Sequence, residues 1–586
     1  MDEIENNVAD ADDSFSEIDQ LHLANRDLQD QLAATRRELE TARASERLIR
    51  ESRWWRLGLA LKNRRNVLFA LRHPIWALKT LAGLRTRRGR LGRGARQSSA
   101  VTARQWLAGI SAEPRVPEDL WIAGIFDDEV ARALEPDCNL ISFRPDNWQA
   151  NLEGRRPHML LVESAERGNG GSWEYRIAST AHADAAGLQD LRELIDWCRA
   201  NGTPTVFWYT GPLGSVDRFS EAAALFDHVV ATEPNAAMRL QRSGELRAAS
   251  VSVVPPGVQP AESSPIGAAL ASDVGAFALS GAPDETFEQL LGAAQTFGLT
   301  IYAAEGADVA RGDGVTFVRP DALERAAANH AVYINGESAG LPVRALRAVA
   351  SGAAVVSVPN AALVDALGGA ATIARSTEEA KEAIQRLLSD DVRRGETRRE
   401  GLRAVLGKHT IRHRIAAIAR AAGLGIDEGF DARVAALVLA PAAADPDAIA
   451  RRLSTSGAFA EIVIGSIDPV RPQNVTEDED QKSPFRVLQQ DRALSESARI
   501  QALAEVVSSP WVALLSADGD TRAVPDLLLA QRFARADVLS VGEAFAFTDT
   551  VDPNDVVARR EIVAARGWPP STQWTREGVR MFTVLR

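Results

Sequence analysis

From about residue 101 onward, short runs of β-branched and aromatic residues alternate with amphipathic helical segments. This alternation predicts parallel sheets covered by helices on both faces, because consecutive parallel strands need a crossover connection between them. The expected strands fall into two groups, residues 120–126, 139–143, 158–163, 205–209, 228–232 and 250–254, then 274–279, 299–303, 315–318, 331–335 and 354–358. The sequence therefore predicts an α/β fold with two Rossmann-like lobes in tandem.

A third segment continues the α/β pattern, with strand candidates at 434–440, 461–464 and 512–515. A chain of 586 residues is too long for a single hydrophobic core, so several packed units are expected. We expect the first lobe at 101–265, the second lobe at 266–426 and a small α/β domain at 427–586.

The N-terminal residues have a different pattern. An acidic tail, residues 1–13, precedes a capping-box spacing and a heptad repeat over 14–51, which predicts a coiled coil. Asn25 falls at an a position of this repeat, where a buried amide favours a parallel homodimer. The alternative is a single amphipathic helix that packs on its own protein.

Residues 52–100 are expected to form basic amphipathic helices and a linker. Between Arg53 and Arg96 there are thirteen Arg or Lys residues and no Asp or Glu. Trp54, Trp55 and Trp76 lie among apolar residues at helical spacing, a composition typical of helices that lie on an anionic membrane surface. The alternative is a basic helix that packs against the acidic remainder of the molecule.

Charge and cysteine content exclude other classes of protein. The net charge of −12 argues against nucleic acid as a partner, because phosphate binding needs clustered cations. Cys138 and Cys198 are too few for a disulfide framework, which indicates a reducing compartment. The sequence shows neither a secretory signal nor an apolar run of spanning length. We expect a cytoplasmic protein, peripheral at the inner face of the cell membrane.

Several segments follow one another in a recognisable order. The first lobe contains GNGGSWEYR (168–176), LRELIDWCRANGTPTVFW, VDRFSEAAALFDHVVATE and VVPPGVQP, and the second contains VYING, LPVRALRAVASGAAVVSVPN and TEEAKEAIQRLLSDDVRRGETRREGLRAVLGKHT. Over residues 115–425 this order resembles the CgeB-like bacterial glycosyltransferases. The resemblance implies a GT-B fold, with a nucleotide-sugar donor in the second lobe and an acceptor on the first. It implies no required cofactor for these lobes.

Physical reasoning predicts sites in the same places, because open parallel sheets bind ligands beyond the carboxyl ends of their strands, and helix N-termini bind phosphate. Arg344 matches an arginine of the family and is expected to bind the donor diphosphate. The expected donor-binding residues are Arg344, Arg347, Glu337, Ser338 and Gly281. The expected acceptor or interlobe residues are Gly170, Gly171, Trp173, Arg176 and Asp217. No catalytic residue is assigned.

Two positions depart from the family pattern. Arg347 stands where the family usually has a glutamate that holds the donor ribose, and the turn at 209–212 lacks the charged residues that the family has there. The predicted function is transfer of a sugar from a nucleotide-diphosphate donor to a cell-envelope glycan, glycolipid or glycoprotein. The departures favour an alternative, a catalytically inactive glycosyltransferase-like membrane scaffold.

The C-terminal segment resembles a shortened family-two glycosyltransferase with a GT-A fold, through SSPWVALLSADGD, PDLLLAQRFARADVLSVG and ARREIVAARGW. In that family an Asp cluster after a strand holds a divalent cation on the donor diphosphate. Asp518 and Asp520 occupy the matching position and could bind Mg²⁺ or Mn²⁺, although Asp-Gly-Asp is also an ordinary turn. We interpret this domain as degenerate.

A lesser alternative is a serine hydrolase. Residues 336–340 form a G-x-S-x-G sequence between a predicted strand and helix, which would make Ser338 a nucleophile with His409 or His413 as base. No HGG-type oxyanion segment precedes it. The two histidines also lack the Glu of an H-E-x-x-H zinc motif, so we expect surface residues there.

Overall fold

The computed structural model describes residues 113–585, except for gaps at 154, 179–184, 244–245, 247, 249–250, 267–272, 279–283, 304–315, 319–329, 429–432, 469–484, 553–555 and 571. The chain divides into two compact units, Met1–Val101 and Thr102–Arg586, and the described residues belong to the second. The predicted coiled coil with Asn25, the basic segment and Gly281 lie outside the described residues.

The first lobe is built on a six-stranded sheet in which all strands are parallel, with the order β2-β1-β3-β4-β5-β6. Every residue of β1, β3 and β4 is buried, which explains the continuous apolar runs in the sequence. All six predicted strands of this lobe are confirmed. Their bounds are β1 (Trp121–Ile125), β2 (Asn139–Ser142), β3 (Met159–Glu163), β4 (Thr205–Tyr209), β5 (His228–Ala231) and β6 (Val251–Val253).

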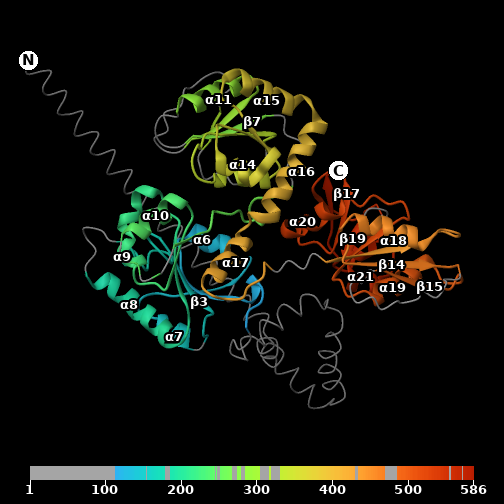
Figure 1. The fold of residues 1–586 in the computed structure, drawn as a ribbon, viewed down its shortest axis with the longest axis horizontal. Helices are drawn as coiled ribbons and strands as arrows, with labels where there is room; N and C mark the ends of the chain where they lie inside the picture. The colour runs from blue at the N-terminus through green and yellow to red at the C-terminus, as the bar shows by residue number, and fades with distance from the viewer. Residues whose placement is uncertain are drawn as a thin grey trace, which may run out of the picture. The chain divides into compact units, whose positions relative to one another are not determined.

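Helices cover both faces of this sheet (Figure 1). One apolar core lies under α7 (Trp148–Glu153), α8 (Ala185–Ala200), α9 (Ser220–Ala223) and α10 (Pro234–Arg242). A second core, on the other face, receives α6 (Asp128–Leu134) and α17 (Ile411–Ala421). The lobe is therefore doubly wound, as the sequence predicted.

The second lobe has a six-stranded parallel sheet with the order β12-β11-β10-β7-β8-β9. The five predicted strands are confirmed, and β12, whose three residues are only half-buried, was not predicted. The bounds are β7 (Val274–Ala278), β8 (Leu299–Ala303), β9 (Thr316–Val318), β10 (Val332–Asn335), β11 (Ala354–Ser357) and β12 (Ala371–Ile373). Its helices are α11 (Glu285–Gln295), α13 (Val343–Ala350), α14 (Ala361–Leu367), α15 (Thr377–Ser389) and α16 (Asp391–Lys408).

Helix α17 follows α16 but packs on the first lobe. Ile415 and Ile418 are fully buried in the core that contains β1 and β3 residues. A bridge between Val258 and Thr410 pairs the segment that leaves the first lobe with the segment that enters α17. The chain thus returns to its first lobe after completing the second, and this return completes the tandem Rossmann-like body predicted as GT-B.

The C-terminal residues form an eight-stranded mixed sheet with the order β15-β14-β13-β16-β19-β17-β20-β18. Strand β19 runs antiparallel to both of its neighbours, whereas the four strands from β15 to β16 are parallel. The three predicted strands are confirmed. The bounds are β13 (Val434–Leu439), β14 (Glu461–Ser466), β15 (Phe485–Gln489), β16 (Trp511–Leu515), β17 (Val538–Gly542), β18 (Ala546–Thr548), β19 (Val556–Arg559) and β20 (Met581–Leu585).

The helices of this last domain are α18 (Pro446–Thr455), α19 (Glu496–Val506), α20 (Val524–Ala534), α21 (Arg560–Arg566) and α22 (Thr572–Arg576). Helix α20 also contacts α16 of the second lobe, where Arg403 donates two hydrogen bonds to the Asp526 carboxylate. None of the helices in the described part of the chain combines the length and apolar character needed to cross a bilayer.

Candidate functional site

The strand order of the second lobe reverses between β7 and β10. Ligands of open α/β sheets bind beyond the strand carboxyl ends at such a reversal. The loop of residues 336–342 leaves β10 there and leads directly into α13. The predicted donor residues Glu337, Ser338 and Arg344 therefore lie on one loop and the helix turn that follows it.

Two asparagines hold this loop. Asn335 donates to the Glu337 carbonyl at 3.0 Å, and Asn360 donates to the same carbonyl at 2.8 Å and to the Gly340 carbonyl at 3.1 Å. The Asn360 side chain also accepts from the backbone N–H of Leu363 and so caps α14. Because both amides are buried and satisfied, the loop has a defined shape before any ligand binds.

Two glycines permit this shape. A Cβ on Gly336 would lie 2.5 Å from the ring of Phe287, so only glycine fits there. Gly340 has a φ of +67°, which L side chains rarely adopt, and a Cβ there would lie 2.6 Å from Oε1 of Glu233 in the first lobe. The G-x-S-x-G sequence is thus explained by backbone geometry.

Arg344 lies in the first turn of α13, next to the loop. Its guanidinium donates to the Glu337 carboxylate at 3.2 Å, and both side chains are about one-third exposed, 30% and 28%. Helix α13 begins after Pro342, and no side chain caps its N-terminus. Its first N–H groups and Arg344 thus together offer donors for an anion.

Arg347 is directed toward the first lobe. Its guanidinium donates to Glu129 of α6 at 3.0 Å, and the Arg347 side chain is 21% exposed. Arg347, which the sequence analysis expected at the ribose-binding position, therefore forms an ion pair with an acidic residue of the other lobe. Contact of Arg347 with a donor remains a prediction.

Ser338 is exposed, and within the described residues it makes no hydrogen bond with a histidine. His413 instead bonds to Thr410 at 2.6 Å, and His409 bonds to Arg414 at 2.8 Å. Burial lowers the pKa of each imidazole to about 4. Within the described residues, neither histidine named as a base for Ser338 is therefore placed to act on it. The structure also corrects the expectation of surface histidines, because His413 is buried.

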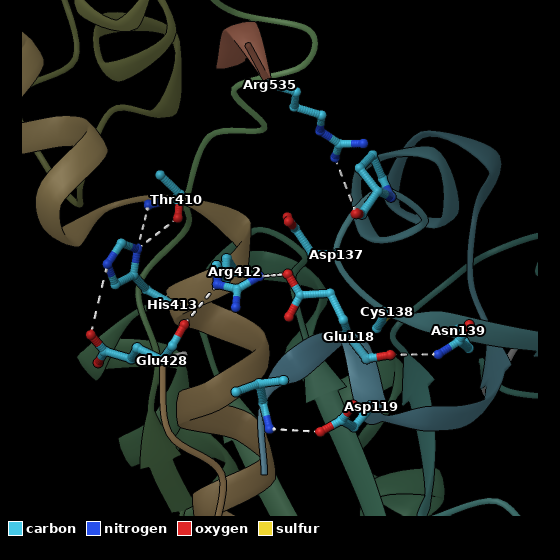
Figure 2. A network of polar contacts seen from close by, with 12 residues as sticks. Glu118, Asp119, Asp137, Cys138, Asn139, Thr410, Arg412, His413, Glu428 and Arg535 are labelled. Atoms are coloured by element: carbon cyan, nitrogen blue, oxygen red, sulfur yellow. Dashed lines mark hydrogen bonds and ion pairs between the residues drawn. The ribbon is translucent and has the colours of Figure 1, made fainter. Parts of the chain in front are cut away.

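His413 belongs to a polar network where α17 meets the first lobe (Figure 2). Figure 2 shows Arg412 paired with Glu118, and His413 between Thr410 and Glu428. Arg535 of the C-terminal domain donates to the carbonyl of Pro136 at 3.2 Å. The contacts of Arg412 and His413 fasten α17, whereas the Arg535 contact joins the C-terminal domain to the first lobe.

The strand order of the first lobe reverses between β1 and β3, and a buried carboxyl lies at this point. Glu163 ends β3 and is 5% exposed. Its carboxylate accepts from the backbone N–H of Asp127 at 3.0 Å and from the hydroxyl of Thr210 at 2.8 Å. The pKa of Glu163 is raised to about 7, mainly by burial and also by the negative charges of Asp127 and Glu129, and the two hydrogen bonds oppose this rise. The sequence analysis did not select Glu163, although an acid that ends an apolar strand run is a recognisable signal.

This carboxyl makes stability depend on pH. Between about pH 4.5 and 7 the folded state retains a proton on Glu163 that the unfolded state has lost, so unfolding free energy falls as pH rises through this window. In the wild type we expect the free energy of unfolding to decrease by on the order of 2–3 kcal/mol from pH 4.5 to pH 8. The variant Glu163→Gln should lack this decrease. Urea unfolding at both pH values measures this decrease, and Glu193→Gln, a change at an exposed glutamate, is the control. If Glu163→Gln showed the same decrease as the wild type, Glu163 could not be its source.

The predicted acceptor loop mainly has a structural role. Gly168, Asn169, Gly170 and Gly171 all have positive φ, and the Asn169 amide donates to the carbonyls of Gly124 and Phe143. Trp173 is fully buried, and its indole N–H donates to the Phe143 carbonyl at 3.0 Å. This corrects the expectation that the Trp173 ring lines the cleft, because the ring packs in the core.

The other two predicted acceptor residues form ion pairs within the first lobe. Arg176 pairs with Asp190 of α8. Asp217 pairs with Arg239 of α10, with an Nε to Oδ1 distance of 3.0 Å. Gly170 is exposed, and no atom lies within 4 Å of a Cβ placed on it. Acceptor contacts by Gly170, Gly171, Arg176 and Asp217 remain predictions.

In the C-terminal domain, the predicted metal residues follow β16. Both carboxylate oxygens of Asp520 accept from Arg522, at 2.8–3.0 Å. Arg452 donates to the carbonyls of Gly519 and Ala517 in the same loop, at 2.9 and 2.5 Å. Across the described ranges, no three His, Cys, Asp or Glu residues are placed to hold a metal ion. Two positively charged guanidinium groups at this loop would repel a divalent cation. Metal binding by Asp518 and Asp520 stays a prediction, and this geometry does not favour it.

Comparison with known proteins bears on the second lobe. Residues 288–420 match the family model described as "Glycosyl transferase-like". The chain carries a glycosyltransferase-like domain. This agrees with the enzyme class predicted from the sequence, and the matched range contains Glu337, Arg344 and Arg347. No curated protein matches the sequence significantly.

Solved structures give distant matches. The GtfA/B complex has a TM-score of 0.29 at 11% identity, covering 45% of this chain and 57% of that chain. HepE of Anabaena with UDP has a TM-score of 0.32 at 12% identity, covering 51% and 90%. A mannosyltransferase of Pyrobaculum calidifontis with GDP-Man and Mn²⁺ has a TM-score of 0.21 at 14% identity, covering 26% and 55%. The chain thus spans little more than half the length of the GtfA/B match and of the mannosyltransferase. TM-scores this low carry no argument about fold or activity.

Proposed function

We propose that this protein is a CgeB-like glycosyltransferase that transfers a sugar from a nucleotide-diphosphate donor to a cell-envelope glycan, glycolipid or glycoprotein. One observation carries the proposal. Within the range that matches the glycosyltransferase-like model, Arg344 and the uncapped N-terminus of α13 converge beside the loop of residues 336–342, at the strand reversal of the second lobe. This is where an open α/β sheet binds a phosphorylated ligand.

In this proposal the residues of the site act on the donor diphosphate. The guanidinium of Arg344 and the first N–H groups of α13 bind its oxygens, and they stabilise the charge that grows on the diphosphate when the bond to the sugar breaks. Glu337 now holds Arg344 at 3.2 Å, so the donor has to compete with that carboxylate for the guanidinium. Asn335 and Asn360 keep the loop in shape, which lowers the cost of ordering it on binding.

Isothermal titration calorimetry tests the proposal. UDP, GDP, ADP and the corresponding nucleotide sugars are titrated into the full chain, with EDTA and with Mg²⁺ or Mn²⁺. We expect at least one nucleotide to bind in EDTA, because Arg344 and backbone amides need no metal. If no nucleotide binds under any condition, the protein is not a nucleotide-sugar transferase and the scaffold alternative stands.

The C-terminal sheet supports a GT-A-like origin for this domain. Four parallel strands, β15 to β16, are followed by the antiparallel β19 and then β17, which is a mixed arrangement of the kind expected for a family-two relative. We propose that the domain is a degenerate relative with a structural role. Arg452 and Arg522 at the loop after β16 favour this view over a second, metal-dependent active site.

For the N-terminal arm we propose a dimeric coiled coil followed by membrane-surface helices at residues 52–96. Basic helices with interfacial tryptophans bind anionic lipid through charge and apolar burial. In a sedimentation assay, we expect the full chain to bind vesicles with 30% phosphatidylglycerol and not vesicles of phosphatidylcholine alone. Deletion of residues 52–96 should abolish binding, whereas deletion of residues 1–13 should preserve it. Equal sedimentation of the chain that lacks residues 52–96 would refute the membrane role.

A second candidate function is the catalytically inactive scaffold. The observation that favours it is the ion pair of Arg347 with Glu129. The family expects a glutamate at position 347 to hold the donor ribose, whereas Arg347 binds an acidic residue of the first lobe. If the protein is a scaffold, its second lobe should be folded but should bind no nucleotide. The calorimetric panel therefore separates the two functions.

A further inference from the structure

We propose that Glu233 of the first lobe is the proton acceptor for the acceptor hydroxyl during sugar transfer. The inference rests on the proposed function, since it assigns a new residue to the same site. Two observations support it. The Glu233 carboxylate lies against the loop that precedes α13, and among the described residues this carboxylate has no hydrogen bond or ion pair.

Glu233 lies at the carboxyl edge of the first-lobe sheet. It follows β5 by two residues and is the N-cap residue of α10, with extended backbone angles of −130° and 143°. An N-cap acid usually accepts from the backbone N–H groups of its own helix. The Glu233 side chain makes no such hydrogen bond, so its carboxylate is directed away from α10.

The carboxylate lies instead against Gly340 of the second lobe. A Cβ built on Gly340 would be 2.6 Å from Oε1, 3.2 Å from Cδ and 3.8 Å from Cγ of Glu233. Gly340 is four residues before Arg344, and its carbonyl is held by Asn360. The absence of a side chain at position 340 therefore gives Glu233 access to the donor site.

Other first-lobe carboxylates near this edge are already engaged. Glu129 pairs with Arg347, Asp217 pairs with Arg239, and Asp127 accepts from the N–H of Gly168 at 2.9 Å. Among the described residues, the half-buried carboxylate of Glu233 has no hydrogen bond or ion pair. An unpaired carboxylate at this edge is free to accept a proton from a bound acceptor.

The chemistry of transfer gives this carboxylate a role. The acceptor hydroxyl oxygen forms a bond to the anomeric carbon of the donor sugar, and the bond from that carbon to the diphosphate oxygen breaks. The electron pair of the broken bond stays on the diphosphate, next to Arg344. The hydroxyl proton passes to Glu233, so the step yields the glycoside, the nucleoside diphosphate and a protonated Glu233.

Glu233→Gln tests this role, because the amide has nearly the same shape but accepts no proton. The probe is the nucleotide sugar that binds best in calorimetry, and turnover is the release of nucleoside diphosphate with water as acceptor. We expect turnover to fall 100-fold or more, in line with general-base catalysis worth about 10²–10⁴. Nucleoside diphosphate affinity should rise about 2- to 5-fold at low salt, because one negative charge beside the diphosphate is removed.

Glu221→Gln is the matched control, since Glu221 is an exposed acid on the neighbouring α9. It should leave both turnover and affinity at the wild-type values. A structural role for Glu233 would lower affinity and turnover together, or neither. Equal turnover of Glu233→Gln and wild type overturns the inference while leaving the proposed donor site intact. Binding without any release by the wild type also overturns it, and absence of binding removes the proposed function itself.

Discussion

Arg344→Ala is expected to weaken nucleoside diphosphate binding about 10- to 100-fold. Charge-assisted hydrogen bonds from a guanidinium contribute on the order of 1.5–3 kcal/mol, which corresponds to this range. The change also leaves the Glu337 carboxylate, now 3.2 Å from Arg344, uncompensated beside the bound phosphates. Both effects act in the same direction. Calorimetric dissociation constants at constant salt measure the loss.

Two further variants make this result specific. Arg344→Lys keeps the charge but cannot bind two oxygens in parallel, so it should recover only part of the affinity. Arg386→Ala removes an exposed arginine of α15 that pairs with Glu382 and should leave the affinity unchanged. Wild-type affinity in Arg344→Ala would exclude this arginine from the donor site.

Trp173→Ala is expected to lower the free energy of unfolding by about 3–5 kcal/mol, the usual cost of truncating a buried tryptophan. The ring is fully buried and packs edge-on against Phe143, with ring centroids 6.0 Å apart. Its removal leaves a cavity, and the Phe143 carbonyl loses one of its two hydrogen bonds while keeping the one from the Asn169 amide. The loss would be read from urea unfolding of the first lobe by circular dichroism.

Trp173→Phe should cost less, because it keeps most of the apolar contact and loses only the indole hydrogen bond. Tyr175→Ala is the control in the same loop, since Tyr175 is 57% exposed and should change stability by less than about 0.5 kcal/mol. If Trp173→Ala and Tyr175→Ala had equal stability, the ring could not have the structural role described.

The parallel strands could be predicted from the sequence because burial on both faces makes them continuously apolar. Strands β1, β3 and β4 are buried at every position and were found with errors of one residue at most. Strands with mixed burial were missed. Strands β15 and β18 contain only exposed and half-buried residues, so neither gives a clear apolar run.

The candidate site could be predicted only where it is contiguous in sequence. The sequence analysis selected Glu337, Ser338 and Arg344 because one loop and one helix turn contain them, and their contact with a donor stays a prediction. Glu233 was missed, because its significance arises from a contact with Gly340, 107 positions further along the chain. Trp173 was misplaced because an aromatic residue in a glycine-rich loop can cover a ligand or anchor the loop, and burial alone distinguishes the two.

Hydrogen exchange of the full chain with and without the nucleoside diphosphate that binds best most directly tests the claim that the second lobe holds the donor. We predict slower exchange in peptides covering residues 335–350, because the ligand engages the first amides of α13, and unchanged exchange at 511–522. Protection confined to 511–522, or no protection at 335–350 under saturating nucleotide, would contradict the account.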